Sequence, residues 1–135
     1  MNTFHLDIVT PTKALDLGDV NYLRAPGVDG LFGVMSGHRD SVFAIDIGGV
    51  KVVRDGKELF FATGRGYAEV TGQKAQLLVE SIEPADKIDV SRAESALKRA
   101  KERLASDEVG IDRQRAETAL ARAINRLEMG KRVPG

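Results

Sequence analysis

The sequence predicts a β + α fold: a flattened β-sandwich or barrel of about 8 to 10 strands in residues 1–84, then an antiparallel two-helix hairpin in residues 85–135. All seven aromatic residues and 11 of the 14 glycines lie before residue 84, as expected for short strands joined by turns. From residue 89 onward, apolar residues recur every three or four positions, which is typical of helices. Pro84 separates the two patterns, because it lacks a backbone donor and ends a strand.

Alternation and turn residues place the strands. Residues 4–9 alternate apolar and polar side chains before Thr10-Pro11, which indicates a half-buried strand. Asp55-Gly56 supplies the positive φ angles of a tight turn, so the flanking residues form the clearest hairpin in the chain. The other strands are expected at 19–25, 31–35, 41–45, 50–54, 57–62, 66–71 and 75–80.

Two aspartates mark the starts of the helices. Asp89 is an N-cap candidate for a helix that runs to residue 105, and Asp112 is one for a second helix that Gly130 and Pro134 end. Residues 106–110 break the pattern between them. The apolar stripes consist mainly of alanine and leucine, which bury little area, so the hairpin needs the sandwich, a ligand or another protein to hold it. Such marginal packing suits a conformational switch.

Composition and charge exclude several classes of protein. The chain has 135 residues, of which 42% are hydrophobic, and this fits either one medium domain or one small domain with an appendage. Because cysteine is absent, disulfides, thiolate metal sites and cysteine nucleophiles are excluded. Residues 1–84 carry 8 basic and 11 acidic residues, whereas residues 85–135 carry 12 and 9. This small basic excess does not indicate nucleic-acid binding, but it suits an acidic surface or an anionic ligand.

The sequence also indicates where the chain resides. No apolar run approaches the length of a membrane span, and the first residues lack the pattern of a signal peptide. A cytosolic chain is therefore expected, with any position at a membrane reached through a partner.

The β part shows no convincing catalytic or metal-binding pattern. Gly64-Arg65-Gly66 is too short for a phosphate loop, and no helix follows it. His5 and His38 have no partners at metal-ligand spacing. We interpret His5 as a surface strand residue and His38 as part of a polar partner-contacting loop, which we favour over a nucleophile–base pair in that loop. We predict no catalytic residues and no metal site.

Arginines recur on both predicted helices at the same spacing. Arg92, Arg99 and Arg103 form one stripe, and Arg115, Arg122 and Arg126 form the other. In a folded hairpin the two stripes could converge, and guanidinium groups bind phosphate oxygens bidentately. Spacing alone favours the simpler interpretation of a solvated charged face over a phosphate site.

Several stretches carry a resemblance to a known family. Residues 4–11, 25–38, 64–70 and 88–93 match its recurring phrases, and residues 25–38 form the longest and most specific match. By these motifs the whole chain resembles the epsilon subunit of bacterial F-type ATP synthase. It departs from the family at Ser36, where proline is common, and at residues 39–41, where small and apolar residues are usual.

The resemblance implies a non-catalytic rotor subunit that couples proton flow to ATP synthesis. The sandwich would contact the gamma subunit and the c-ring, on the cytoplasmic side of the bacterial plasma membrane. The hairpin would either fold onto the sandwich or extend along gamma toward the alpha and beta subunits and inhibit ATP hydrolysis. The basic residues available for that contact are Arg113, Arg115, Arg122, Arg126, Lys131 and Arg132.

Some bacterial members of this family bind ATP on the folded hairpin without hydrolysing it. Their motif, Ile/Leu-Asp-x-x-Arg-Ala, is present here at residues 88–93. Because of this motif, the resemblance favours a nucleotide site over a solvated charged face. We hypothesise that the carboxylates bind adenine or ribose and that the arginines face phosphates. ATP would be a regulatory ligand, and no cofactor is required; the alternative is a coupling subunit without nucleotide binding. The implied ATP-binding residues are Glu83, Ile88, Asp89, Arg92, Ala93, Arg99, Arg122 and Arg126.

Overall fold

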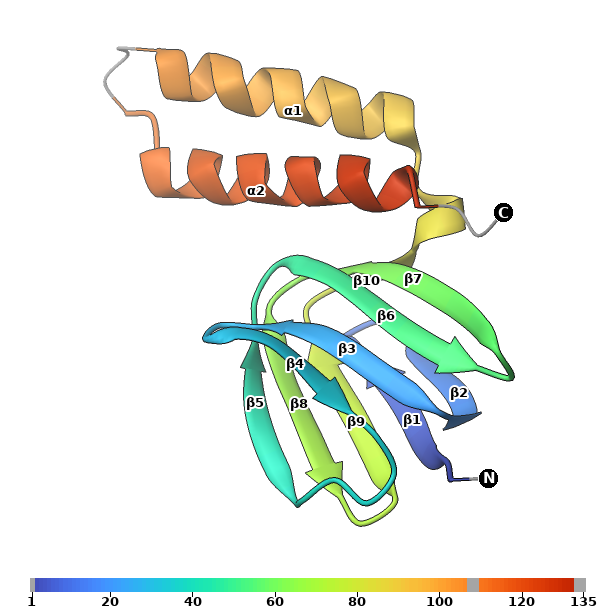
Figure 1. Cartoon of the computed structure of the whole chain (residues 1–135). Helices are drawn as coiled ribbons and strands as arrows, with labels where there is room; N and C mark the ends of the chain where they lie inside the picture. Colours follow the sequence, from blue (N-terminus) through green and yellow to red (C-terminus); the bar gives the residue numbers. More distant parts are fainter. Residues whose placement is uncertain (1, 107–109, 133–135) are drawn as a thin grey trace.

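The computed structural model describes residues 2–106 and 110–132. Within this part of the chain, a curled ten-stranded β-sheet is followed by a 3₁₀ turn and two packed α-helices, which confirms the predicted fold class (Figure 1). The division into units of 1–84 and 85–135 stays a prediction. The elements are β1 Phe4–Val9, β2 Ala14–Val20, β3 Tyr22–Gly27, β4 Gly30–Val34, β5 Ser41–Ile45, β6 Gly48–Arg54, β7 Lys57–Thr63, β8 Gly66–Thr71, β9 Lys74–Val79, β10 Ile82–Pro84, η1 Ala85–Lys87, α1 Val90–Ala105 and α2 Arg113–Gly130.

The sheet folds over on itself to enclose the core. Its strand order is β10-β7-β6-β3-β5-β8-β9-β1-β2, with β4 paired to β3. β1 lies between β2, to which it is antiparallel, and β9, to which it is parallel. Every second side chain of the central strands points inward, as the period of a β-strand requires. The largest fully buried side chains are Leu6, Ile8, Val20, Leu23, Val34, Ile45, Val50, Val52 and Leu77.

The predicted strand at 19–25 is wrong in its bounds. β2 ends at Val20, and β3 begins at Tyr22 after Asn21, whose backbone N–H donates to the carbonyl of Val53 at 2.8 Å. β2 is an edge strand with only half-buried leucines, and Gly18 has a φ of 68° where the pairing with β1 shifts register. Its two leucines alternate with exposed residues, but the register shift beside Gly18 changes the phase before buried Val20, so the alternation is too short to mark the whole strand.

The pairing of β1 with β2 also gives His5 neighbours that sequence spacing did not indicate. His5 Nε2 lies 2.9 Å from Asp16 Oδ1 and 3.3 Å from Asp7 Oδ1. The imidazole is therefore a partly covered, hydrogen-bonded strand residue on the outside of the sheet.

The hairpin between β6 and β7 has the predicted tight turn. Asp55 has a φ of 53° and Gly56 a φ of 75°, which is the left-handed geometry that Asp-Gly favours.

Both predicted helix caps are present. The Asp89 side chain accepts from the backbone N–H of Arg92 at 3.0 Å, and the Asp112 side chain accepts from that of Arg115 at the same distance. Gly130 is the last residue of α2, while Pro134 and most of the predicted break, residues 107–109, lie outside the described residues. In the described helices the only fully buried positions of α1 are alanines, Ala93 and Ala100, and this permits close contact with α2.

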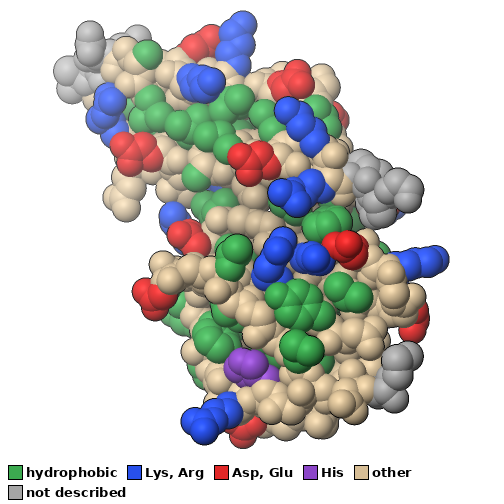
Figure 2. All heavy atoms as spheres, viewed as in Figure 1, with side chains coloured by type: hydrophobic (Ala, Val, Ile, Leu, Met, Phe, Trp, Pro, Cys, Tyr) green, Lys and Arg blue, Asp and Glu red, His purple; other side chains and the backbone are tan. Residues whose placement is uncertain are grey.

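The hairpin lies against the sheet through α2. α2 contacts β6, β7 and η1, whereas α1 lies on the side of α2 away from the sheet (Figure 1). On the face shown in Figure 2, hydrophobic side chains gather along the hairpin between Lys, Arg, Asp and Glu side chains. No helix in the described residues is both long and apolar enough to cross a membrane.

Candidate ligand site between the hairpin and the sheet

Gly49 of β6 lets α2 approach the sheet closely, and the carbonyl of Gly48 beside it accepts a hydrogen bond from the helix. Asn125 Nδ2 donates to the Gly48 carbonyl at 2.8 Å, so this buried amide has a backbone partner. A Cβ on Gly49 would lie only 2.6 Å from the Met129 sulfur. Met129 packs in a small apolar cluster with Ala62 and Ile88, with Phe60 at its margin. In this part of the contact between α2 and the sheet, one amide hydrogen bond lies beside a small apolar cluster.

Arg126 makes the strongest polar contact between α2 and the sheet. Its Nε donates to Glu83 Oε1 at 2.9 Å and its Nη2 to Glu83 Oε2 at 3.1 Å. Both side chains are about one-third exposed, at 30% and 34%. A bidentate pair of this kind fixes orientation as well as charge, so it defines how α2 lies over β10.

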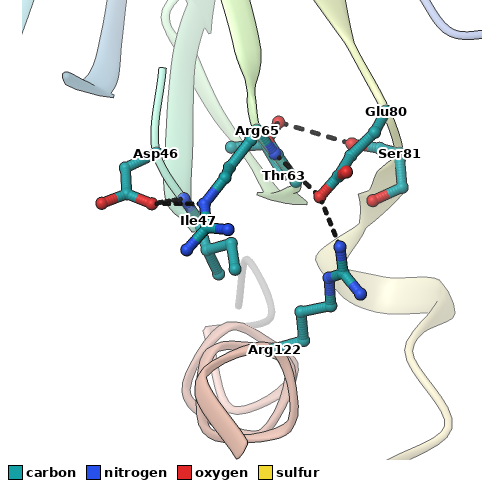
Figure 3. A network of polar contacts seen from close by, with 8 residues as sticks. Asp46, Ile47, Thr63, Arg65, Glu80, Ser81 and Arg122 are labelled. Atoms are coloured by element: carbon teal, nitrogen blue, oxygen red, sulfur yellow. Dashed lines mark hydrogen bonds and ion pairs between the residues drawn. The ribbon is translucent and has the colours of Figure 1, made fainter. Parts of the chain in front are cut away.

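Arg122, one turn earlier, contacts a second carboxylate. Its Nη2 donates to Glu80 Oε1 at 2.8 Å, and the same oxygen accepts the backbone N–H of Arg65 at 3.1 Å. Arg65 in turn donates from Nε to Asp46 Oδ1 at 3.2 Å (Figure 3). Burial on its own raises the pKa of Glu80, but the Arg65 hydrogen bond and the Arg122 guanidinium together outweigh it, so the pKa is lowered.

Arg122, Arg126 and Glu83 line a hollow of about 250 Å³ beneath α2. Two guanidinium groups at its edge suit an anion, while hydroxyl groups of Thr63 and Ser81 line its wall. Arg122 also borders a second hollow of about 350 Å³, which runs along α2 toward Asp112. The first hollow is lined by Ile47, Ala62, Thr63, Gly64, Ser81, Ile82, Glu83, Arg122, Asn125 and Arg126.

A larger hollow of about 500 Å³ lies between α2 and strands β3 and β6. Its lining is mostly apolar, its Lys51 is paired with Glu58 at 2.9 Å, and its Arg132 lies over the Phe60 ring, 5.9 Å from the centroid. None of the predicted ATP-binding residues lines it, so we place the candidate site at the smaller hollow.

The structure brings together three of the eight predicted site residues. Glu83, Arg122 and Arg126 line one hollow. Arg92 and Arg99 are exposed on α1, do not line that hollow, and make no side-chain hydrogen bond or ion pair within the described residues.

The other three predicted residues have structural roles in this conformation. Ile88 packs in the apolar cluster beneath α2, and Ala93 is fully buried on α1. Asp89 caps α1. A role for any of the eight residues in nucleotide binding stays a prediction.

Sequence reasoning missed Glu80 and Asn125. Asn125 interrupts the apolar face of α2 beside Ile124, and a polar residue at such a position is a readable signal for a buried contact. Glu80 follows a strand in an ordinary polar turn, so nothing in the sequence marks it out.

Comparison with known proteins places this architecture in a family. Residues 3–85 match the model of the ATP synthase Delta/Epsilon chain β-sandwich domain, and residues 86–130 match that of the long alpha-helix domain. Together the two models cover nearly all of the chain, which therefore belongs to the ATP synthase Delta/Epsilon chain family.

Within that family the chain is similar to epsilon chains. It is 40% identical to the ATP synthase epsilon chain of Desulforamulus reducens over 126 residues, which cover 93% of this chain and 96% of that one. It is 42% identical to the epsilon chain of Staphylococcus saprophyticus over 113 residues, which cover 83% and 84%. It is thus an epsilon chain, a non-catalytic subunit with a part in ATP synthesis and proton transport.

Solved structures share the fold at low sequence identity. A chain in the Euglena gracilis mitochondrial ATP synthase structure of OSCP, F1 and c-ring superposes with a TM-score of 0.79 at 22% identity, over 88% of this chain and 76% of that one. A chain in the central stalk and c-ring structure of the Tetrahymena thermophila mitochondrial ATP synthase gives 0.67 at 12% identity, over 93% and 95%.

Proposed function

We propose that this epsilon chain is a rotor subunit in the central stalk of a bacterial F-type ATP synthase, where it couples proton flow to ATP synthesis and restrains ATP hydrolysis. Its place would be peripheral, on the cytoplasmic side of the plasma membrane. The bacterial relatives support this assignment, as does the shared fold of a chain in the central stalk and c-ring structure of the Tetrahymena thermophila mitochondrial ATP synthase.

The sandwich offers an apolar surface for the gamma subunit and the c-ring. Val28, Leu31 and Val42 are 58%, 69% and 68% exposed, and they line one shallow hollow. Beneath them the Phe32 and Phe43 rings stack with centroids 4.2 Å apart. Large apolar side chains gathered on one surface of a soluble chain favour a protein interface.

The hairpin would be the regulatory element, with ATP as its ligand. The observation that carries this proposal is the pair of guanidinium groups, Arg122 and Arg126, beside one hollow between α2 and the sheet. A ligand bound there would touch both parts of the chain and stabilise the docked hairpin by mass action. At low ATP the hairpin would be released, and its basic residues would reach acidic surface on the beta subunits and inhibit hydrolysis.

The test is calorimetric titration of ATP into the isolated chain and into an Arg122→Ala/Arg126→Ala variant, which removes the two guanidinium groups that line the hollow. We expect the intact chain to bind ATP and the variant to lose binding, since both guanidinium groups are proposed phosphate ligands. An Arg39→Ala/Lys57→Ala variant loses the same charge at exposed sandwich positions and is the matched control. Absence of binding at millimolar ATP would reject the nucleotide site.

A second candidate function is coupling without nucleotide binding. It is favoured by one observation: Arg122 and Arg126 already have carboxylate partners, at 2.8 and 2.9 Å, and need no ligand to satisfy them. In that case the arginines would serve the docked hairpin and the extended contact with the beta subunits only. The same titration discriminates the two functions.

A further inference from the structure

We infer that Glu80 is a positioning residue, which holds Arg122 against the sheet when no anion is bound and yields it to the phosphates of a nucleotide. The second half of this inference rests on the proposed ATP site, whereas the first half does not. Glu80 belongs to neither the predicted ligand residues nor the family motif at residues 88–93.

The sheet fixes the Glu80 carboxylate independently of the helix. The Glu80 backbone N–H donates to the Arg65 carbonyl at 2.9 Å, and the Arg65 backbone N–H donates back to Glu80 Oε1 at 3.1 Å. Gly64 leaves the space in which the side chain lies, because a Cβ there would be 2.4 Å from Glu80 Cγ and 2.6 Å from Oε1. The acceptor is therefore already in place when α2 approaches.

Arg122 is the easier of the two arginines to displace. It gives Glu80 one hydrogen bond, whereas Arg126 gives Glu83 two. The Arg122 and Glu80 side chains are 49% and 41% exposed, so water already screens their attraction. Arg122 also borders both hollows, and a phosphate in either one could take its free N–H groups.

Because Glu80 and phosphate compete for Arg122, removal of the Glu80 charge should affect docking and ATP affinity in opposite directions. When ATP is absent, the Glu80 charge favours the docked hairpin. When ATP is bound, Arg122 has moved to phosphate and the Glu80 charge no longer contributes. Removing that charge should therefore loosen the nucleotide-free hairpin and at the same time make ATP bind more tightly.

The experiment measures docking by energy transfer between dyes at Thr71→Cys and Glu117→Cys in the full chain. Both positions are exposed, one on β8 and one on α2, and the chain has no cysteine of its own. Undocking is followed by energy transfer through a urea titration, so that a change in the docking constant can be measured even if the hairpin is mostly docked without urea. We expect Glu80→Gln to lower the docking constant about two- to fivefold without nucleotide, the range for an exposed ion pair. Saturating ATP should restore the original transfer, with a tighter apparent Kd.

Three further variants separate this role from a general structural one. Glu69→Gln removes an exposed carboxylate from β8 and should leave docking and ATP binding unchanged. Glu80→Gln made in an Arg122→Gln background should cause no further loss of docking, because Glu80 acts through Arg122. Gly64→Ala keeps every charge but displaces the Glu80 side chain, so it should loosen docking in the same direction.

Two results would overturn the inference. One is an unchanged docking constant in Glu80→Gln without nucleotide, and the other is weaker ATP binding, which would make Glu80 part of the ligand site. If ATP binds neither protein, the proposed nucleotide site fails and release to phosphate fails with it. The nucleotide-free comparison then still decides whether Glu80 holds Arg122.

Discussion

Arg122 and Arg126 lie one helical turn apart on α2, yet they make different contacts with carboxylates of the β part. Arg126 has a bidentate partner in Glu83, and Arg122 shares one oxygen of Glu80 with a backbone N–H. Because a two-point contact fixes orientation and a one-point contact does not, neighbouring residues of the same type have different mobilities. A substitution scan that treats the arginines as equivalent would miss this difference.

The lowered pKa of Glu80 predicts that docking depends on pH. A carboxyl group whose pKa falls on folding contributes its full stabilisation above its ordinary value of 4.5 and loses it as the pH falls through the lowered value. We therefore expect the energy-transfer difference between the unaltered chain and Glu80→Gln to be constant near neutrality and to be lost in acid, as the pH falls below 4.5 and through the lowered pKa. The difference would be small, because the Glu80 side chain is 41% exposed. A difference that does not decline at any acid pH at which the sheet stays folded would contradict the assignment.

The residues of the candidate site differ in how far the sequence alone predicts their roles. The family resemblance singled out Glu83, Arg122 and Arg126 in advance, whereas the spacing of the arginines alone favoured a solvated charged face. Gly49 and Gly64 carried no such signal, since each matters only because a side chain distant in sequence occupies the space that a Cβ would fill. Steric fits of this kind depend on the packed structure and on no local pattern.

The helices illustrate how well local chemistry predicts an element. Both N-caps follow from an aspartate placed before an apolar stripe, and the structure confirms both. β2 was missed for the opposite reason: its alternation changes phase at the register shift beside Gly18, and its position is set by pairing with β1 at the edge of the sheet. The two helices, whose own residues determine where they begin, were predicted. β2, whose position depends on its pairing with β1, was not.

Loss of the α2 cap should weaken the hairpin selectively. Asp112→Ala removes the side-chain acceptor for the Arg115 backbone N–H, which costs about 1 kcal/mol at a typical N-cap. We expect urea-induced undocking of the hairpin to shift to lower urea while unfolding of the sheet stays unchanged. Asp112→Asn, which keeps an acceptor, should restore most of the loss. Equal shifts in the two transitions would show that the hairpin and the sheet unfold together.

For the whole molecule, the distribution of buried residues predicts that the sheet can fold alone and that the two helices cannot. The main apolar cluster runs from Phe4 to Ile82 and includes no helical residue. The buried helical positions of the described residues are mostly alanines, and isolated helices of this length are marginal in water.

We accordingly expect residues 1–87 alone to fold cooperatively, with circular dichroism of a β-sheet and a melting transition close to that of the sheet in the full chain. Residues 85–135 alone should show little helix. A peptide of 85–135 that is strongly helical at micromolar concentration, where self-association is absent, would contradict this expectation.

The parallel pairing of β1 with β9 has a consequence for how the chain is made. β1 is synthesised well before its inner neighbour, residues 74–78, so it stays unpaired on that side until those residues have emerged from the ribosome. During this interval Leu6 and Ile8 face water, and an open strand edge is available to other nascent chains. Contacts between such distant residues also slow folding. Because of this order of synthesis, β1 and β9 pair late, shortly before the helices that dock on the sheet emerge.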